Sequence, residues 1–531
     1  MKKQSKFLHK VFGLHTAECL IFLVSFLILS VISYEILKYG ATTAPDFLQN
    51  VFFSDLFSEK KTLLYCNELN EEIFPIFGGR GFRLTVNKEC LSHGSMHGFI
   101  IILGLAKIIW KDSFYFVVPF FASLALIFFY KICNFFFSKK LSLAGAIILF
   151  FFPPFFFFST LLFNNIPATS LFLAVVYFLI KGAEEDQKWY FYSSAFAGAM
   201  IWVRYDYFLF VAPIIFFLFK KVINKSLSLK KLSYISLPFL LFLVFLGLTN
   251  INLYGDLFGY KGGDFSSLAN FPTDYSAGIN TIKILSFLPP ISGSVFFTNF
   301  YRYIVQDKEI ILAFFIFSMF YVFINSSRNE NSKKDKLKSF SLLFLSFIII
   351  PIFFYCSSVW SGFKEPQSVV ANSYSRYLLP TYTFIIFFLL TTLDRFKSYI
   401  KILFFIFYFL WSLNISFFSP GGIVDHIEAQ KRFSEIKINY LENIPEENAV
   451  VFTIFCDKYI FPDRTTAIYN SFKKDEIEEN TIFAINKLFK KKIPIYFIKN
   501  EGIFFGDNFF KKNLFRVIEI NDSLVKIEEM K

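Results

Sequence analysis

The residues most able to do chemistry gather in one polar interval, residues 39–97, which separates the first long apolar run from a series of others. The interval holds carboxylates, guanidinium groups and imidazoles: Asp46, Asp55, Glu71, Glu72, Arg80, Arg83, His93 and His97. A carboxylate can take a proton from an attacking hydroxyl group, and the arginine fork suits a phosphate. The interval therefore predicts a site with a reactive carboxylate and groups that can bind a phosphate.

Asp46 is the carboxylate that we expect to be catalytic. It follows closely on the outer end of the apolar run at residues 17–38, which places it near the lipid headgroups. Acidic residues at a membrane are costly, so an acid there marks a candidate site. Asp55, nine positions later, is a secondary candidate because the chain between them reads as a helix lying on the membrane. For both residues the alternative is a solvated loop acid.

Four arginines are the candidate ligands of a donor phosphate: Arg80, Arg83, Arg204 and Arg376. All four fall on the outer side in the topology given below, at loop positions or helix ends. Membrane insertion favours cytoplasmic lysines but gives no reason for outward-facing arginines. Two alternatives stay open: Arg204 pairs locally with Asp206, and Arg376 extends to the headgroups of membrane lipids.

The histidines and the glutamate pair suggest a metal site only weakly. His93 and His97 have the i, i+4 spacing of helical metal ligands, but Gly94 weakens a helix there and no third ligand is evident. Contacts to headgroups or loop hydrogen bonds are the alternative. Glu71 and Glu72 are secondary candidates that could join Asp46 in holding a divalent cation such as Mg²⁺ or Mn²⁺. No other cofactor is indicated.

Composition and charge point to a membrane protein. Apolar residues make up 55% of the 531, and the mean hydropathy is +0.50. Runs long enough to cross a hydrocarbon core of about 30 Å recur along the chain. The net charge of +13 arises from lysines beside these runs, as in cytoplasmic flanks of membrane helices, so it implies no nucleic-acid partner.

The topology is that of a polytopic α-helical membrane protein with about eleven crossings. The run at 98–110 is too short to cross and is expected to be re-entrant, which leaves every basic cluster on the cytoplasmic side. The N-terminus is then cytoplasmic, with Lys2, Lys3, Lys6 and Lys10, and the interval 39–97 is a long first outer loop. Twelve apolar runs are visible, at 17–38, 98–110, 114–136, 141–163, 166–181, 189–203, 205–219, 234–253, 309–325, 339–358, 377–393 and 399–418.

Near Pro420 the composition changes from apolar to charged, which predicts a division into a transmembrane domain, 1–419, and a soluble domain, 420–531. Strand-length apolar runs at 449–455, 493–498, 515–520 and 524–527 alternate with helical patterns at 424–443 and 475–490. We expect a small extracytoplasmic α/β domain. Cys66 and Cys90 share the long loop; free thiols are expected, and a disulfide is the alternative if the loop faces an oxidising compartment.

Several local motifs, taken in order, resemble the GT-C superfamily of integral-membrane glycosyltransferases. They are PDFLQNVFFSDLF, GSMHGFIIILGLAKIIW, FFPPFFFFSTLLFNN, GAMIWVRYDYF, NLYGDLFGY and RYLLP, within residues 15–395. The nearest relatives in style are the protein mannosyltransferases and the lipid A aminoarabinose transferases.

The resemblance implies an inverting transfer of a sugar from a polyprenyl-phosphate donor to a lipid, glycan or protein acceptor on the outer face of the cell membrane. Asp46 would be the general base, with Arg204 and Arg376 holding the donor phosphate. Two departures stand out. Asn164 and Asn165 occupy a position where relatives often carry an acid, and Asp46 is followed by Phe47 instead of a second acid.

A transporter or flippase, or a non-catalytic binder of lipid-linked sugars, is the competing class. A transporter is expected to carry paired broken helices and ionisable residues near the bilayer midplane. Here the apolar runs are largely free of charge, and polar groups concentrate in one outer layer. The pattern favours chemistry at a membrane surface.

Overall fold

The chain folds into two compact units, which we call the helical unit and the loop–sheet unit. The helical unit comprises Met1–Ile36, Ser113–Val244 and Ile284–Ile427, and the loop–sheet unit comprises Leu37–Asp112, Phe245–Lys283 and Glu428–Lys531. This computed structural model describes residues 16–40, 44–73, 77–86, 90–94, 96–255, 257, 293–305, 332–357, 370, 373–468, 477–499 and 506–530.

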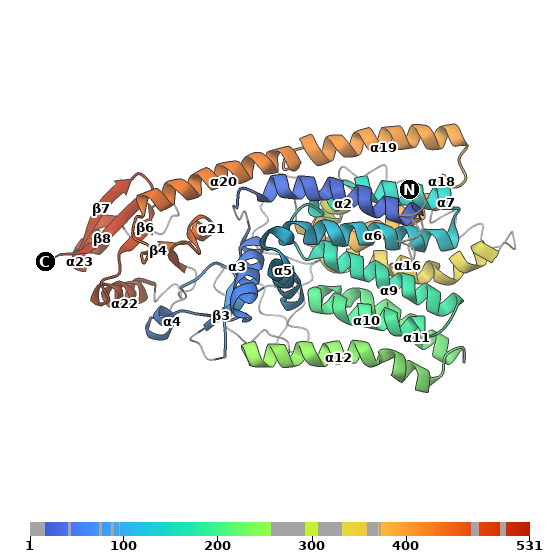
Figure 1. Cartoon of the computed structure of the whole chain (residues 1–531), viewed down its shortest axis with the longest axis horizontal. Coiled ribbons are helices and arrows are strands. Elements are labelled where there is room, and N and C mark those ends of the chain that lie inside the picture. Colours follow the sequence, from blue (N-terminus) through green and yellow to red (C-terminus); the bar gives the residue numbers. More distant parts are fainter. Residues whose placement is uncertain are drawn as a thin grey trace. The chain divides into compact units, whose positions relative to one another are not determined.

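Long apolar helices dominate the helical unit, and several run alongside one another in Figure 1. The described α-helices that lie wholly or almost wholly in this unit, short ones included, are α2 (Thr16–Leu37), α6 (Phe114–Phe136), α7 (Lys139–Phe151), α8 (Pro153–Phe158), α9 (Asn165–Glu184), α10 (Trp189–Val203), α11 (Phe208–Ile223), α14 (Gly293–Phe300), α16 (Ser332–Ser357), α17 (Ser373–Tyr377), α18 (Leu379–Leu393) and α19 (Ser398–Phe418). Helices α12 (Leu229–Tyr254) and α20 (Ile423–Asn443) begin in the helical unit and end in the loop–sheet unit.

Helices α2 and α6 pack antiparallel. The Ser25 hydroxyl donates to Ser123 Oγ at 2.8 Å, and the Ser33 hydroxyl donates to the carbonyl of Tyr115 at 2.9 Å. At the other end of the pair, Lys131 Nζ lies 3.2 Å from the buried Glu18 carboxylate. The chain therefore leaves α2 and enters α6 at the same end of the pair. The re-entrant course expected for the apolar run at 98–110 stays a prediction.

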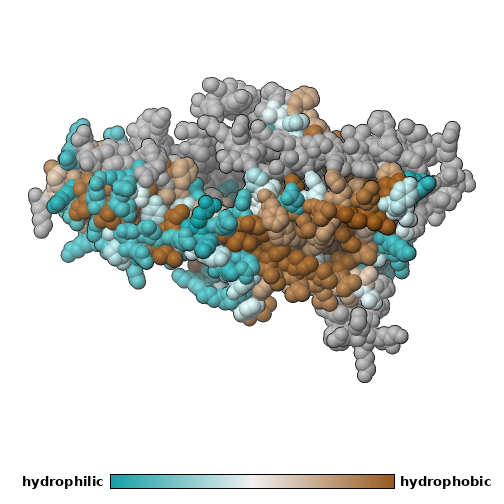
Figure 2. Space-filling view, turned by 90° about the horizontal axis from the view of Figure 1, so that it is seen from above, coloured by the Kyte–Doolittle hydropathy of each residue, from teal (hydrophilic) through white to brown (hydrophobic). Residues whose placement is uncertain are grey.

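Six helices in the described part of the chain are long and apolar enough to span a membrane: Thr16–Leu37, Lys111–Phe136, Asn165–Glu184, Leu229–Tyr254, Ser339–Ser357 and Ser398–Asn443. Apolar residues cover much of the helical part of the surface in Figure 2. Together these features confirm a polytopic helical membrane protein. The count of eleven crossings stays a prediction, because α7, α10, α11 and α18 are shorter and the expected run at 309–325 lies outside the described residues.

Two breaks divide the apolar helices. Helix α7 ends at Phe151 and α8 starts at Pro153, because proline at a first helical position lacks only an N–H that the helix would not use. Helices α10 and α11 are separate, since Arg204 adopts an extended backbone with φ −159°. The two helices match the separate apolar runs expected at 189–203 and 205–219.

The loop–sheet unit contains a five-stranded mixed sheet in the order β5-β4-β6-β8-β7, which confirms the small sheet domain near the C-terminus. Its elements are β4 (Val450–Thr453), α21 (Asp457–Ile460), β5 (Thr465–Ile468), α22 (Ile477–Lys490), β6 (Ile495–Ile498), α23 (Gly506–Lys512), β7 (Phe515–Asn521) and β8 (Leu524–Glu529). Strands β5, β4 and β6 are parallel, and β8 and β7 join antiparallel. Strand β5 was not expected from the sequence.

The long loop packs onto this sheet. Phe77 forms an antiparallel bridge with Ala467 of β5, and Gly78 donates its N–H to the Thr466 carbonyl at 2.9 Å. The segment thus covers the open edge of β5, where unpaired backbone groups would otherwise be exposed. Leu69, Ile73 and Phe77 are buried in the same apolar core as the inner face of the sheet. The first loop and the C-terminal strands consequently form one core.

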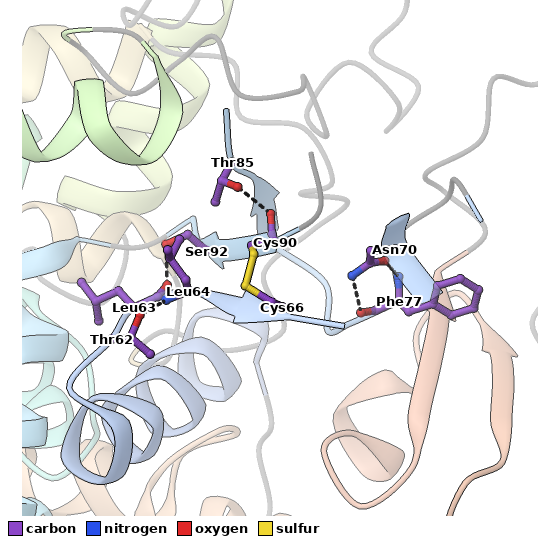
Figure 3. Close-up of a disulfide and its surroundings, with 9 residues drawn as sticks. All are labelled: Thr62, Leu63, Leu64, Cys66, Asn70, Phe77, Thr85, Cys90 and Ser92. Carbon is purple, nitrogen blue, oxygen red and sulfur yellow. Dashed lines mark hydrogen bonds between the residues drawn. A yellow bond between two sulfur atoms is a disulfide. The ribbon is translucent and has the colours of Figure 1, made fainter. Parts of the chain in front are cut away.

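The rest of the loop forms short elements and a second, smaller sheet. These elements are α3 (Pro45–Lys60), β1 (Tyr65–Cys66), α4 (Glu68–Glu72), β2 (Phe82–Leu84), β3 (Cys90–His93) and α5 (His97–Ile109). Cys66 and Cys90 are antiparallel partners in the sheet and form a disulfide, shown in Figure 3. The expectation of free thiols was wrong because strand register, which brings the two sulfurs together, is not visible in the spacing of the residues.

Candidate functional site

Arg204 and Asp206 form a nearly buried ion pair at the corner between α10 and α11. Arg204 Nε lies 2.7 Å from Asp206 Oδ1, and Nη2 donates to Asp206 Oδ2 at 2.8 Å. Nη1 donates to Asn164 Oδ1 at 2.6 Å, and the Tyr355 hydroxyl donates to Asp206 Oδ2 at 2.7 Å. The alternative of a local Arg204–Asp206 pair is thus what the structure contains, and the charge of Arg204 is balanced by its neighbour.

Arg376 belongs to the same cluster, on the short helix α17. Asn165 Nδ2 donates to its backbone carbonyl at 3.1 Å, and its guanidinium lies over the rings of Phe163 at 4.6 Å and Tyr377 at 5.2 Å. The guanidinium of Arg204 lies 4.7 Å from the centroid of the Tyr377 ring. The ring of Tyr377 therefore contacts both arginines.

The helical unit accordingly brings together five residues that sequence analysis had singled out separately: Asn164, Asn165, Arg204, Asp206 and Arg376. Two tyrosines that were not expected from the sequence, Tyr355 and Tyr377, complete the cluster. Tyr377 directly follows Arg376 in the RYLLP motif, so its position was a usable signal. Tyr355 gave none, because it reads as one more aromatic residue of an apolar run.

Asp46 lies in the first turn of α3, in the loop–sheet unit, and is partly exposed. Pro45 starts this helix, and the positive end of the helix dipole favours a negative charge in its first turn. One turn further along, Gln49 accepts a hydrogen bond from the N–H of Gly94 at 2.7 Å and donates to the Arg80 carbonyl at 3.4 Å. Gln49 thereby ties the first turns of α3 to the turns at Arg80 and Gly94 of the loop.

Glycine is required in these turns because neighbouring atoms lie too close to the backbone to leave room for a side chain. A Cβ atom on Gly94 would lie 2.3 Å from the Gly81 carbonyl and 3.3 Å from Arg83 Nε. A Cβ on Gly81, which has φ +82°, would lie 2.0 Å from Gln49 Nε2. Arg83 therefore lies at the turn that Gln49 holds, in the same part of the loop–sheet unit as the start of α3.

Arg80 pairs with Asp457 of the C-terminal strands' domain. Its Nε donates to Asp457 Oδ1 at 2.6 Å and its backbone N–H donates to Asp457 Oδ2 at 2.8 Å. Nη2 donates to the Phe455 carbonyl at 3.2 Å. Asp457 follows β4 and is fully buried; this burial raises the pKa of its carboxyl group, an effect that Arg80 opposes. We therefore leave Arg80 out of the phosphate site proposed below.

The other loop acids have cationic partners. Asp55 accepts a hydrogen bond from the buried ammonium group of Lys107, in α5, at 2.7 Å. Glu72 pairs with Lys491 at 2.7 Å, and the hydrogen bond from Lys491 lowers the pKa of Glu72. Glu71 lies beside it in α4. Within the described residues no group of three His, Cys, Asp or Glu side chains is arranged to hold a metal ion.

His93 and His97 form a buried hydrogen-bonded pair. His97 Nδ1 lies 2.8 Å from His93 Nε2, and His97 Nε2 lies 2.7 Å from Asn250 Oδ1. Asn250 donates through Nδ2 to the Leu257 carbonyl, so its Oδ1 must accept from His97. Burial lowers the pKa of His97 to about 4. Both nitrogens of the neutral ring are used, which fits the alternative of loop hydrogen bonds better than metal ligation.

Comparison with known proteins agrees with this architecture. Residues 92–249 match the family model described as dolichyl-phosphate-mannose-protein mannosyltransferase. The matched stretch includes Asn164, Asn165, Arg204 and Asp206 but neither Asp46 nor Arg376. None of the curated proteins with which the chain was compared matches it.

Two solved structures share the fold. ArnT from Cupriavidus metallidurans bound to undecaprenyl phosphate matches with a TM-score of 0.56 and 10% identity, over 96% of this chain and 97% of that one. The archaeal oligosaccharyltransferase AglB from Archaeoglobus fulgidus, in complex with an inhibitory peptide and a dolichol-phosphate, matches with a TM-score of 0.51 and 11% identity, over 90% of this chain and 69% of that one. The chain therefore has the fold of the integral-membrane GT-C glycosyltransferases, which confirms the resemblance of its motifs to that superfamily.

Proposed function

We propose that this protein is a membrane glycosyltransferase that moves a sugar from a polyprenyl-phosphate donor to an acceptor on the outer face of the membrane. The observation that carries the proposal is the cluster around Arg204, Arg376 and Tyr377 in a chain with the GT-C fold. The relative that shares the fold over nearly its whole length holds undecaprenyl phosphate, which supports a lipid phosphate as the donor group.

The charge of the cluster assigns different roles to its two arginines. Arg204 is neutralised by Asp206, so the Arg204–Asp206 pair adds no net charge. We assign the phosphate to Arg376, whose guanidinium lies over the rings of Phe163 and Tyr377, and Arg204 fixes Tyr377 and Asn164 around it. A sugar phosphodiester carries one negative charge and becomes a phosphomonoester with a second as the sugar departs. A fixed guanidinium stabilises that developing charge.

In the proposed reaction the acceptor oxygen attacks the anomeric carbon from the side opposite the phosphate. The bond from that carbon to the phosphate oxygen breaks, and the polyprenyl phosphate leaves with the bonding electron pair. Asp46 takes the proton of the acceptor hydroxyl as general base. One displacement of this kind inverts the configuration at the anomeric carbon. Arg83, at the turn that Gln49 ties to α3, is the loop arginine that we keep as a secondary phosphate ligand.

We assign the metal no role in this reaction. Two of the candidate ligands proposed for Mg²⁺ or Mn²⁺, Glu71 and Glu72, lie in α4, where Glu72 is paired with Lys491. Asn164 and Asn165 present amides where a carboxylate would hold a cation more strongly. Within the part of the chain that the structure describes, these residues do not fit a divalent-cation site, so no step passes through one.

The Cys66–Cys90 disulfide supports an extracytoplasmic loop, because disulfides persist in oxidising compartments. The strands at the C-terminus share a core with this loop, so the C-terminal domain would lie on the same side and the N-terminus on the cytoplasmic side. The boundary between a transmembrane domain, 1–419, and a soluble domain, 420–531, is part of this proposal. A lipid, a glycan or a protein can supply the acceptor hydroxyl.

The test is a transfer assay with purified protein, undecaprenyl-phosphate-linked sugars and a membrane extract as the source of acceptor. Wild-type protein is expected to release undecaprenyl phosphate only when acceptor is present. Asp46→Asn is expected to lower this rate at least a hundredfold, because general-base catalysis contributes roughly 10²–10⁴-fold. Glu59→Gln, which removes an exposed carboxylate from the same helix, is the matched control and is expected to leave the rate unchanged.

Two outcomes count against the proposal. Full activity of Asp46→Asn would remove the assignment of the base. Movement of intact lipid-linked sugar across a vesicle membrane, without release of undecaprenyl phosphate, would favour the transporter class instead.

A further inference from the structure

Asn165 is fully buried, yet its side-chain oxygen has no hydrogen-bond partner among the described residues. A buried acceptor left unpaired loses its hydration without compensation, so such atoms in native structures call for a partner. The residue starts α9 and lies in the cluster that contains both arginines.

The orientation of the Asn165 amide is fixed by its other half. Nδ2 donates to the Arg376 carbonyl at 3.1 Å, so reversing the amide would bring two acceptors together and leave the NH₂ group unpaired. The atom without a partner is therefore the oxygen, and only a hydrogen-bond donor can satisfy it.

The described donors that contact Asn165 are committed to other acceptors. The hydroxyl groups of Thr169 and Tyr207 contact the backbone oxygen of Asn165, at 2.8 and 3.1 Å, and not its side chain. Arg204 donates through Nη1 to Asn164 Oδ1 and through Nη2 to Asp206 Oδ2. The missing donor is consequently expected from a bound molecule.

We propose that Asn165 Oδ1 accepts a hydrogen bond from a hydroxyl or amino group of the donor's sugar, and so helps to select the sugar. The proposal rests on the function proposed above. A phosphodiester has oxygens that only accept hydrogen bonds, so the phosphate cannot satisfy Oδ1, whereas a sugar hydroxyl can. In this arrangement Arg376 holds the phosphate. Asn165, which is hydrogen-bonded to the backbone of Arg376, binds the adjacent sugar.

The experiment compares two probes on the full-length protein: undecaprenyl phosphate, which has no sugar, and the tightest binder from a panel of undecaprenyl-phosphate-linked hexoses and pentoses. Asn165→Leu is expected to weaken binding of the sugar-linked probe about tenfold, the loss of one neutral hydrogen bond, and to leave undecaprenyl phosphate unaffected. Asn165→Ala, which adds no bulk, is measured beside it in case the leucine variant does not fold. Arg376→Gln is the contrasting variant and is expected to weaken both probes.

Equal weakening of both probes by the Asn165 variants would overturn the proposal, since it would mean that Asn165 only supports Arg376. Unchanged binding of both probes would also overturn it and would leave a buried water as the partner of Oδ1. If wild-type protein binds neither probe, the proposed function itself fails, which is a different result.

Discussion

Replacing Asp457 with alanine removes the carboxylate that holds Arg80 of the first loop against the C-terminal sheet. Asp457 is fully buried and accepts from both the side chain and the backbone of Arg80. Removing one partner of a buried pair costs about 3–5 kcal/mol, and the partly exposed side chain of Arg80 favours the lower value, about 3 kcal/mol. For a unit of this size that free energy corresponds to a fall in Tm of roughly 6–12 °C.

The assay is thermal unfolding of the purified full-length protein in detergent, with a double-mutant cycle of Asp457→Ala and Arg80→Ala. The double variant is expected to be little less stable than either single variant, because each alone already breaks the pair. Lys491→Ala is the matched control: it breaks the exposed pair with Glu72 and should leave the Tm unchanged. If the two effects on the Tm simply add, or if Asp457→Ala behaves like the control, the Arg80–Asp457 contact does not stabilise the loop.

Three further outcomes are expected. Cys66→Ser combined with Cys90→Ser should lower the free energy of unfolding by about 3 kcal/mol and abolish any response of the Tm to reductant, because the disulfide closes a loop between residues 24 positions apart. Since the pKa of His97 is about 4 when folded and 6.5 when unfolded, only the unfolded chain gains this proton as the pH falls through 6.5. Wild-type stability should therefore drop by about 3 kcal/mol more than that of His97→Gln between pH 6.5 and 4, in unfolding titrations at each pH, and equal losses would contradict the assignment. Asp206→Asn should lower the free energy of unfolding by about 3 kcal/mol, measured by denaturant titration, because it leaves Arg204 nearly buried without its counter-ion; unchanged stability would contradict this.

Much of the helical architecture was predictable because apolar length and broken patterns are local features. The corner at Arg204 ends a helix between the apolar runs 189–203 and 205–219, where the sequence indicated. Four of the C-terminal strands are continuous apolar runs or clear alternations, but β5 begins with two threonines and lacks that signal. Its place in the sheet comes from pairing with β4 and from the Phe77 bridge.

The contacts of the candidate site were less predictable, because most join residues far apart in the chain. Arg80 and Asp457 are separated by 377 positions, and Lys107 reaches Asp55 across 52. Nothing local in the sequence indicates either pair, so Arg80 and Asp55 were singled out as site candidates for their charge alone. The Arg204–Asp206 pair was visible as an alternative because its partners are two residues apart.

The most direct test of the central claim is a structure of the full chain with an undecaprenyl-phosphate-linked sugar bound. We expect the phosphate to lie within hydrogen-bonding distance of the Arg376 guanidinium. We expect Asn165 Oδ1 to accept a hydrogen bond from a sugar hydroxyl or amino group, and the Asp46 carboxylate to face the anomeric carbon from the side opposite the phosphate. A phosphate held away from Arg376, or an Asp46 carboxylate turned away from the sugar, would contradict the central claim.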